Sequence, residues 1–404
     1  MYRARELLYN ESMAPLNRIH IGFFGKMNAG KSSLVNALCG QDVSVVSAEA
    51  GTTTDPVKKP LEILGVGPVV LIDTAGIDDT SVLGEKRVAR TRESLDQVDL
   101  AVLVFAEKWT SDDEQLLQAC RQKDIPVLCV QNKTDLFASP VSVEGETVLA
   151  FSCVRPDVET LRAEIKKRIP ANLLTADTLL EGIVRAGEEV VLVIPIDASA
   201  PEGRLILPQV QTIRHLLDIG AVAVCVKDAQ LADYLKNHTP KLVITDSQAF
   251  KFVSSVVPKE IPLTSFSILF SRMKGNFAWY LSGSPVIDTL KDGDKVLMLE
   301  SCSHTVNKCD DIGRVKIPAL LQKKTGQKLS FTFISNLDPL PADLGSYKLA
   351  IQCGGCMVTR NQILRRLEKL RTAGVAVTNY GLAIAYCNGI FARVTAVFAE
   401  NGGK

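Results

Sequence analysis

The octapeptide Gly25-Lys-Met-Asn-Ala-Gly30-Lys31-Ser32 constrains the fold more than any other part of this 404-residue chain. It has the spacing of a phosphate-binding P-loop, and it lies between an apolar run at 19–24 and a helical pattern that begins at Lys31. Glycines let backbone N–H groups approach phosphate oxygens, Lys31 offers positive charge to the β- and γ-phosphates, and the Ser32 hydroxyl can bind Mg²⁺. A strand, this loop and a helix in that order predict a nucleotide-binding α/β domain.

The sequence that follows, up to about residue 169, alternates strand and helix patterns as such a domain does. Apolar runs at 69–72, 100–105 and 127–130 alternate with helical patterns up to about residue 169. This alternation is typical of a mostly parallel sheet covered by helices. We therefore expect residues 1–17 to form an N-terminal segment and residues 18–170 to form the P-loop domain.

Two polar motifs follow strands of this domain and indicate which nucleotide it binds. In Asp73-Thr-Ala-Gly76, Asp73 can hold Mg²⁺ through water and the Gly76 amide can contact the γ-phosphate. In Asn132-Lys133-Thr-Asp135, the carboxylate can accept hydrogen bonds from N1 and the exocyclic N2 of guanine, groups that adenine cannot donate. The nucleotide is therefore expected to be GTP, hydrolysed to GDP.

One element later, Ser152 and Cys153 fit the loop that closes over the guanine base. The full set of expected nucleotide-binding residues is Gly25, Asn28, Ala29, Gly30, Lys31, Ser32, Ser33, Gly76, Asn132, Lys133, Asp135, Ser152 and Cys153.

Charge and hydropathy limit the partners. The chain has 46 basic and 45 acidic residues, so no broad electrostatic field favours a nucleic acid or an anionic membrane. The first 18 residues carry charges throughout, and the longest apolar runs are only as long as strands. We expect a cytoplasmic protein with neither nucleic acid nor membrane as a partner.

After a short predicted hinge at 170–177, strand and helix patterns alternate a second time. Strand patterns at 189–194, 221–226 and 241–245 enclose helical patterns at 210–218 and 229–237. A third unit has strand patterns near 295–299, 330–334 and 348–351, followed by a helix over 360–372. The expected fold is a P-loop domain followed by two smaller α/β domains at 178–270 and 271–404.

The third unit carries a cysteine pattern typical of a metal site. Cys302-Ser-His304 and Gln352-Cys353-Gly-Gly-Cys356 are expected at two strand ends, and the spacing in the second lets one tight turn present two thiolates. Three cysteines with His304 would suit zinc, and three cysteines alone would suit an iron–sulfur cluster with an open iron. The residues favour neither metal. Six other cysteines are expected to be ordinary buried thiols, and Cys309 stays unassigned; the six are Cys39, Cys120, Cys129, Cys153, Cys225 and Cys387.

The nucleotide motifs resemble those of the TrmE–Era–Septin class of GTPases over residues 19–170. The resemblance implies that Gly51-Thr-Thr-Thr-Asp55 is the first switch loop, with Thr53 on Mg²⁺, and that Asn28 holds K⁺ against the phosphates. It implies Lys31, Asp73 and Thr53 as the catalytic residues. Position 77 is Ile, not the glutamine that orients water in Ras-like proteins, so hydrolysis should be slow and depend on K⁺ and dimerisation.

The order of GTPase motifs, middle α/β domain and C-terminal cysteine motif resembles the HydF family of [FeFe]-hydrogenase maturation proteins along nearly the whole chain. The resemblance implies a homodimeric GTPase whose domain at 178–270 mediates dimerisation and whose domain at 271–404 binds a [4Fe–4S] cluster. It implies a scaffold that receives a di-iron precursor made with the radical-SAM maturases HydE and HydG and delivers it to apo-hydrogenase.

Carried over to this chain, the resemblance makes Cys302, Cys353 and Cys356 the cluster ligands and His304 a candidate fourth ligand. This chain has Gln352 where the family motif has a histidine, so the fourth iron would bind His304 or an exchangeable ligand. The alternative is a potassium-dependent GTPase of tRNA modification or ribosome assembly with a structural zinc module. A redox enzyme is a third possibility, but the chain has no second cofactor motif.

Overall fold

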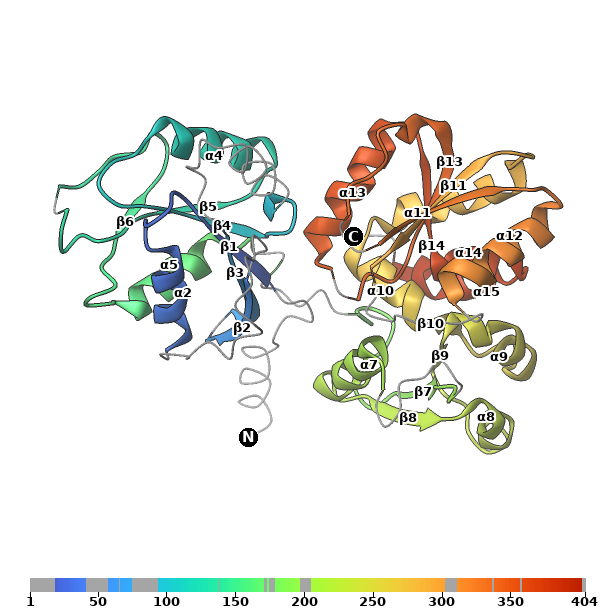
Figure 1. Cartoon of the computed structure of the whole chain (residues 1–404). Helices are drawn as coiled ribbons and strands as arrows, with labels where there is room; N and C mark the ends of the chain where they lie inside the picture. Colours follow the sequence, from blue (N-terminus) through green and yellow to red (C-terminus); the bar gives the residue numbers. More distant parts are fainter. Residues whose placement is uncertain are drawn as a thin grey trace, which may run out of the picture. The chain divides into compact units, whose positions relative to one another are not determined.

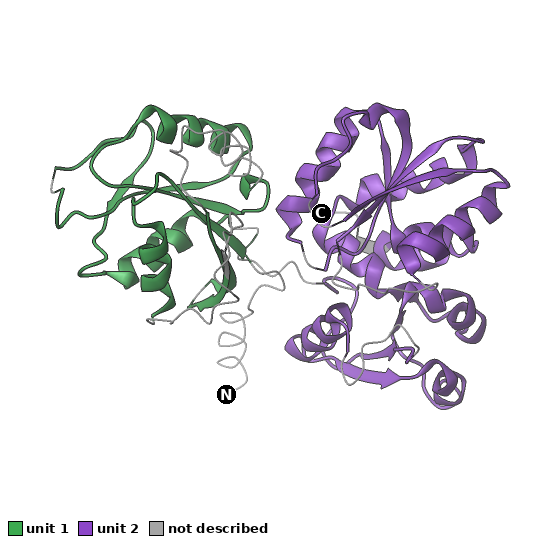
Figure 2. Ribbon diagram, viewed as in Figure 1, with its two compact units in different colours: residues 1–177 green, residues 178–404 purple. Residues whose placement is uncertain are grey.

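A computed structural model describes residues 19–40, 57–64, 66–74, 94–137, 139–170, 173, 179–196, 205–301, 311–335, 338–356 and 358–401. The chain forms two compact units, Met1–Asp177 and Thr178–Lys404, which Figure 2 colours separately. Within the described ranges, no helix is both long and apolar enough to cross a bilayer.

The first unit is a six-stranded sheet with strand order β2-β3-β1-β4-β5-β6. All neighbouring strands are parallel except β2, which runs antiparallel to β3. The strands are β1 (Ile19–Phe24), β2 (Val57–Ile63), β3 (Gly67–Asp73), β4 (Leu100–Phe105), β5 (Val127–Gln131) and β6 (Val148–Ala150). The expected strands are confirmed, because runs buried on both faces of a parallel sheet leave a continuous apolar signal.

Helices cover both faces of this sheet. Figure 1 shows α4 on one side and α2 with α5 on the other. Two separate apolar clusters match these layers: Leu34 and Leu161 belong to one, and Leu117 belongs to the other. The helices are α2 (Lys31–Cys39), α4 (Ser111–Gln122) and α5 (Val158–Arg168).

The second unit holds two parallel four-stranded sheets, with orders β10-β9-β7-β8 and β12-β11-β13-β14. The first consists of β7 (Glu189–Val193), β8 (Val222–Val226), β9 (Leu242–Thr245) and β10 (Leu263–Ser265). The second consists of β11 (Lys295–Glu300), β12 (Ser330–Ser335), β13 (Tyr347–Gln352) and β14 (Ala376–Asn379).

The helices of the second unit follow the strands closely. Those of its first half are α7 (Leu207–Asp218), α8 (Asp228–Tyr234), α9 (Phe250–Val256) and α10 (Phe266–Lys274), with a short turn η1 (Ser247–Ala249). Those of its second half are α11 (Phe277–Gly283), α12 (Ile317–Thr325), α13 (Arg360–Thr372), α14 (Tyr380–Cys387) and α15 (Phe391–Thr395). Short helical turns η2 (Ser284–Thr289), η3 (Ile312–Lys316), η4 (Leu344–Ser346) and η5 (Ala396–Asn401) complete it.

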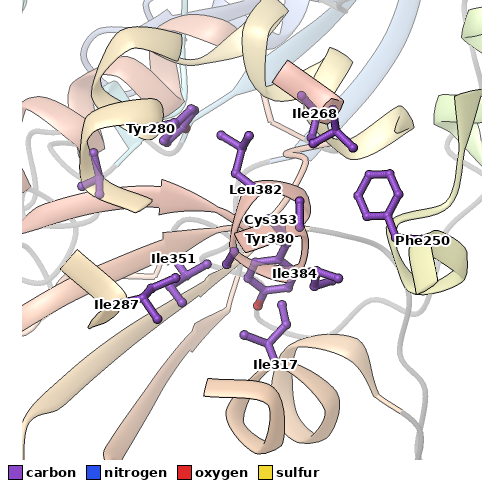
Figure 3. Close-up of a cluster of buried hydrophobic side chains, with 14 of the residues drawn as sticks. Phe250, Ile268, Tyr280, Ile287, Ile317, Ile351, Cys353, Tyr380, Leu382 and Ile384 are labelled. Carbon is purple, nitrogen blue, oxygen red and sulfur yellow. The ribbon is translucent and has the colours of Figure 1, made fainter. Parts of the chain in front are cut away.

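The two sheets of the second unit share one apolar core. A single cluster of buried side chains contains Val191 on β7, Phe250 on α9 and Leu297 on β11. Figure 3 shows part of it, with Cys353, Leu382 and Tyr380 among the labelled members. The two smaller α/β segments are therefore packed together through their interiors.

One expectation about the cysteines is wrong. Cys225 is exposed, because it lies on the edge strand β8, whose side chains are partly or fully exposed. Cys120 and Cys129 are buried as expected, whereas Cys39, Cys153 and Cys387 are half-buried. An apolar alternation alone does not distinguish an edge strand from a central one.

Candidate nucleotide site and cysteine turn

The loop between β1 and α2 has a backbone that only glycine allows at two places. Gly25 has a φ of 141° and Gly30 a φ of 93°. A Cβ atom on Gly25 would lie 2.0 Å from the Val104 carbonyl oxygen, and one on Gly30 would lie 2.1 Å from Nδ2 of Asn132. Because neither position has room for a side chain, the backbone of the loop can lie directly against β4 and the end of β5, in the shape of a phosphate cradle.

Lys31 lies at the start of α2 and points back into this loop. The side chain is buried, and its Nζ donates hydrogen bonds to the carbonyl oxygens of Gly25 (2.9 Å) and Lys26 (2.8 Å). The ammonium is thus held inside the cradle, where phosphates would meet it. Ser32 and Ser33 are exposed in the first turn of the same helix, as a metal or phosphate contact requires.

Asp73 ends β3, opposite Phe23 in the parallel register of β1. Its Oδ1 is buried and accepts no hydrogen bond from the residues that the structure describes. The next residue, Thr74, is hydrogen-bonded to β1, because its hydroxyl donates to the Phe23 carbonyl oxygen at 2.6 Å. A buried carboxylate oxygen that lacks a proton donor, at the end of a strand beside the P-loop, suits a water bound to Mg²⁺.

Asn132 connects the base end of the site to the phosphate end. Its side chain is buried at the end of β5, and Nδ2 donates to the Ala29 carbonyl at 2.9 Å. The Cys153 thiol donates to Oδ1 of the same amide at 3.5 Å. The buried Asn132 amide therefore holds the P-loop and the following loop in one arrangement.

Asp135 and Ser152 meet at the exposed rim of the site. The Ser152 hydroxyl donates to the Asp135 carboxylate at 2.5 Å. Lys133 adopts a left-handed backbone conformation, with a φ of 59°. The Thr134 hydroxyl donates to the Phe151 carbonyl oxygen at 3.0 Å, so the loop that follows β5 is hydrogen-bonded to the loop that follows β6. Asp135 itself is exposed, as a contact with a base edge requires.

The structure thus brings together the predicted residues from Gly25 to Ser33, Asp73, and the set from Asn132 to Cys153. Thr53 and Gly76 lie outside the described residues. The Mg²⁺ contact of Thr53 and the phosphate contact of Gly76 therefore stay predictions from the sequence.

The second candidate site is the turn after β13. Sγ of Cys353 is buried and accepts hydrogen bonds from the backbone N–H groups of Ser301 (2.9 Å) and Gly355 (3.4 Å). Gly355 has a φ of 66°, and a Cβ there would lie 2.4 Å from Cδ1 of Ile363. Two N–H groups that converge on one sulfur favour its thiolate form, which is the form that binds metals.

Cys356 closes this turn in front of α13. Burial, together with nearby Cys353, raises the pKa of its thiol to about 12, whereas Lys274 lowers it. A capping box starts this helix: the Thr359 amide donates to Oε1 of Gln362 at 2.8 Å, and the Gln362 amide donates to Oγ1 of Thr359 at 3.4 Å. The positive N-terminus of α13 therefore begins four residues after Cys356, at Arg360.

Gln352, where the resemblance leads one to expect a histidine, is turned toward the end of β11. Nε2 of this buried amide donates to the Leu299 carbonyl and to Oγ of Ser301, both at 3.4 Å. Nε2 also lies 3.7 Å from Sγ of Cys353, and Oε1 has no hydrogen-bond partner among the described residues. The side chain binds to the strand end and supplies a weak donor to the sulfur.

Cys302 and His304, like Cys309, lie outside the described residues. In the ranges that the structure does describe, no three His, Cys, Asp or Glu side chains gather as metal ligands would. The Cys353–Cys356 turn nevertheless fits a metal centre, because its donors point at sulfur and Ser301, the residue before Cys302, lies beside Cys353. When bound, an iron–sulfur cluster would supply exchangeable iron and electron transfer, and Cys353 and Cys356 would hold it.

Sequence reasoning missed Lys274, whose Nζ donates to the carbonyl oxygens of Gly355 (2.7 Å) and Val358 (2.9 Å). It is the last residue of α10, where a lysine normally reaches water and interacts with the helix dipole. The sequence therefore contains no signal for this contact.

Comparisons with known proteins find three family models that match successive parts of the chain. Residues 278–397 match the hydrogen maturase F tetramerization domain, and residues 179–275 match the hydrogen maturase F dimerization domain. Residues 20–133 match the 50S ribosome-binding GTPase family, so the first unit is a GTPase domain.

Curated relatives include the tRNA modification GTPase MnmE of Nitrosomonas europaea, 38% identical over 156 residues, which are 37% of this chain and 34% of that protein. MnmE of Bacillus cytotoxicus is 35% identical over 173 residues, 42% of this chain and 36% of that protein. The chain thus spans about a third of the length of these curated relatives.

Similar solved structures include Era in complex with MgGDPNP and nucleotides of 16S ribosomal RNA, with a TM-score of 0.32 and 21% identity over 52% of this chain and 91% of that chain. A point variant of Aquifex aeolicus Era bound to GDP and AlF4⁻ gives a TM-score of 0.31 and 20% identity over 59% and 97%. The two matched domains that fill residues 179–275 and 278–397 are both named for hydrogen maturase F and follow a GTPase domain, so this chain belongs to the hydrogen maturase F (HydF) family.

Proposed function

We propose that this protein is a GTPase and an iron–sulfur scaffold that carries the di-iron subcluster of [FeFe]-hydrogenase and delivers it to the apo-enzyme. In this proposal residues 18–170 bind GTP and Mg²⁺, residues 178–270 form the homodimer, and residues 271–404 bind a [4Fe–4S] cluster. The maturases HydE and HydG supply the di-iron precursor, and the protein acts in the cytoplasm.

The observation that carries the cluster proposal is the pair of backbone N–H groups on Sγ of Cys353, at 2.9 and 3.4 Å. Such donors stabilise a metal-bound thiolate and raise the reduction potential of a cluster. Zinc thiolates accept the same bonds, and membership of the HydF family is what supports iron over zinc in this proposal. Cys302, Cys353 and Cys356 would then hold three irons, and the fourth would bind His304 or an exchangeable ligand.

The cluster is tested by anaerobic reconstitution, with iron, sulfide and zinc counted for the wild type and for single Cys302→Ala, Cys353→Ala and Cys356→Ala variants. Each variant should lose most of the iron, because two thiolates hold four irons poorly. Cys387→Ala, which removes a half-buried thiol of the same unit, is the matched control and should keep its iron. Stoichiometric zinc without sulfide in the wild type would instead support the alternative of a GTPase with a structural zinc module.

The proposed GTPase activity is slow and stimulated by K⁺. Asn28 lies exposed in the P-loop with a φ of 61°, where its amide oxygen can coordinate an ion beside the phosphates. GTP turnover should be faster in KCl than in NaCl of equal ionic strength, and Asn28→Ala should remove the difference. Equal wild-type rates in the two salts would refute the potassium site.

A further inference from the structure

Lys274 is a buried cation at the edge of the cysteine turn. Its side chain is 3% exposed, although lysine is among the residues that are least often buried. Besides the bonds to the Gly355 and Val358 carbonyls, Nζ lies 3.5 Å from the Cys356 carbonyl oxygen. One ammonium group therefore holds three carbonyl oxygens of the segment that runs from the second cysteine into α13.

The helix that carries Lys274 is also linked to the cysteine motif through its other end, by way of the Asn379 side chain. Oγ of Ser267 donates to Oδ1 of Asn379 at 3.2 Å, and Nδ2 of Asn379 donates to the Gln352 carbonyl at 3.0 Å. Gln352, the residue before Cys353, is thus linked to α10 through Asn379, and the residues around Cys356 are hydrogen-bonded to α10 through Lys274.

These contacts cross the junction between the two maturase segments. Helix α10 ends at Lys274, inside the segment that matches the dimerization domain, whereas Gly355, Cys356 and Val358 lie in the segment that matches the tetramerization domain. The cysteine turn is therefore supported by a helix from outside its own domain. Without that helix, the carbonyl oxygens around Gly355 would lose their donor and the turn its fixed shape.

We propose that Lys274 is a positioning residue: through it α10 holds the Cys353–Cys356 turn in the shape that receives a metal centre, and its charge favours the reduced form of a cluster bound there. The first part depends only on the protein. The second rests on the proposed function, because it requires the cluster. A positive charge close to a cluster stabilises the electron that reduction adds, so its loss should lower the reduction potential.

The first part is tested by hydrogen–deuterium exchange of the metal-free full chain, with peptides that cover residues 353–358. Lys274→Met removes the ammonium and keeps the length of the side chain. Exchange in this peptide should accelerate about tenfold or more, the factor that corresponds to about 1.4 kcal/mol of local stability. Peptides from β11 should be unchanged, and Lys251→Met, a substitution at an exposed site on α9, is the matched control. Unchanged exchange at 353–358, or equal acceleration throughout residues 178–404, would overturn the proposal.

The second part is tested by an electrochemical titration of the reconstituted protein. The midpoint potential should fall in Lys274→Met, and Lys274→Arg, which keeps the charge, should restore much of it. An unchanged potential in a loaded Lys274→Met protein would overturn the electrostatic role. If the wild type takes up no iron, the cluster function fails, while the exchange experiment still decides the mechanical role.

A folding defect in Lys274→Met would be seen by circular dichroism. In that case Lys274→Gln takes its place in both experiments, since it keeps two N–H donors but shortens the side chain and removes the charge. Its exchange rate and midpoint potential should move in the same directions, and no movement in either would contradict the proposal.

Discussion

At the scale of single residues, the proposed base end of the nucleotide site rests on one exposed carboxylate. Asp135 is held by the Ser152 hydroxyl and lies after the buried Asn132, which fixes the loop against the Ala29 carbonyl. A carboxylate has only acceptors, so it selects a base edge that presents two donors.

This chemistry predicts a change of nucleotide in Asp135→Asn. An amide offers one acceptor and one donor, which suits xanthine, where a carbonyl oxygen replaces the exocyclic amine of guanine. GDP affinity should fall roughly 10–100-fold, the range for one lost pair of charge-assisted bonds, and XDP should become the preferred ligand. Calorimetric titration with both nucleotides measures this, and a variant that still prefers GDP would contradict the role of Asp135.

The buried histidine His215 leads to a prediction about how the stability of the second unit depends on pH. His215 on α7 is 1% exposed, and neither ring nitrogen has a hydrogen-bond partner among the described residues. Burial lowers the pKa of His215, although the carboxylates of Asp218 and Glu181 oppose the shift. A histidine with a lowered folded-state pKa binds its proton more readily after unfolding, so the second unit should lose stability as the pH falls below about 6.5.

The measurement is urea unfolding between pH 8 and pH 5 in a Trp109→Phe background, which leaves Trp279 in the second unit as the reporter. His215→Leu removes the titrating group and should flatten the pH dependence. An equally steep loss of stability in His215→Leu would assign that dependence to other groups.

At the scale of helices and strands, the sequence predicts elements well where burial and capping agree. Helix α13 has the predicted bounds, 360–372, because Thr359 and Gln362 cap its start and Gly374, with a φ of 74°, follows its end. The helix expected at 210–218 begins a turn earlier, at Leu207, since Pro208 is favourable in a first helical turn. The strand β2 carries two lysines and a proline on a sheet edge, so its pattern resembles a loop.

Element packing explains what local patterns could not predict. Sequence reasoning placed the P-loop residues and both cysteines of the turn correctly on strand ends, because those motifs are local. The shared core of the two smaller α/β segments and the contact from Lys274 to Gly355 arise between residues far apart in the chain. Periodicity reports which face of an element is buried, but not the partner against which it packs.

The close approach of α11 to β14 gives a prediction at this scale. A Cβ atom on Gly283 would lie 2.0 Å from the Val377 carbonyl oxygen, and backbone atoms there cannot give way without moving the strand. Gly283→Ala should therefore destabilise the second unit by roughly 1–3 kcal/mol, as overpacking commonly does. The control is Gly345→Ala, because the nearest atom to its Cβ would be the Ala373 carbonyl oxygen at an ordinary 3.7 Å. Urea midpoints read from Trp279 should fall only for Gly283→Ala, and equal midpoints would show that the helix can shift.

At the scale of the whole molecule, the two tryptophans of the chain report on one unit each. Trp109 in the first unit packs edge-on against Phe105 and donates to Glu114 at 3.0 Å. Trp279 in the second unit lies under the Arg371 guanidinium, 4.9 Å from its ring centroid. Two single-tryptophan proteins, Trp279→Phe and Trp109→Phe, therefore separate the unfolding of the two units.

Nucleotide should stabilise the first unit alone if no structural change links the two sites. A ligand that binds only the folded state adds about 2.7 kcal/mol at a hundred times its Kd. MgGDP should therefore raise the melting temperature that Trp109 reports by several degrees and leave the Trp279 transition in place. Lys31→Ala should abolish the effect on Trp109, because it removes the ammonium from the cradle, and should leave the cluster signal of the reconstituted protein intact. A nucleotide-dependent rise in the Trp279 transition would mean that the GTPase site and the cysteine turn are coupled, since a ligand that shifts one unit must act through a contact or a shared state with the other.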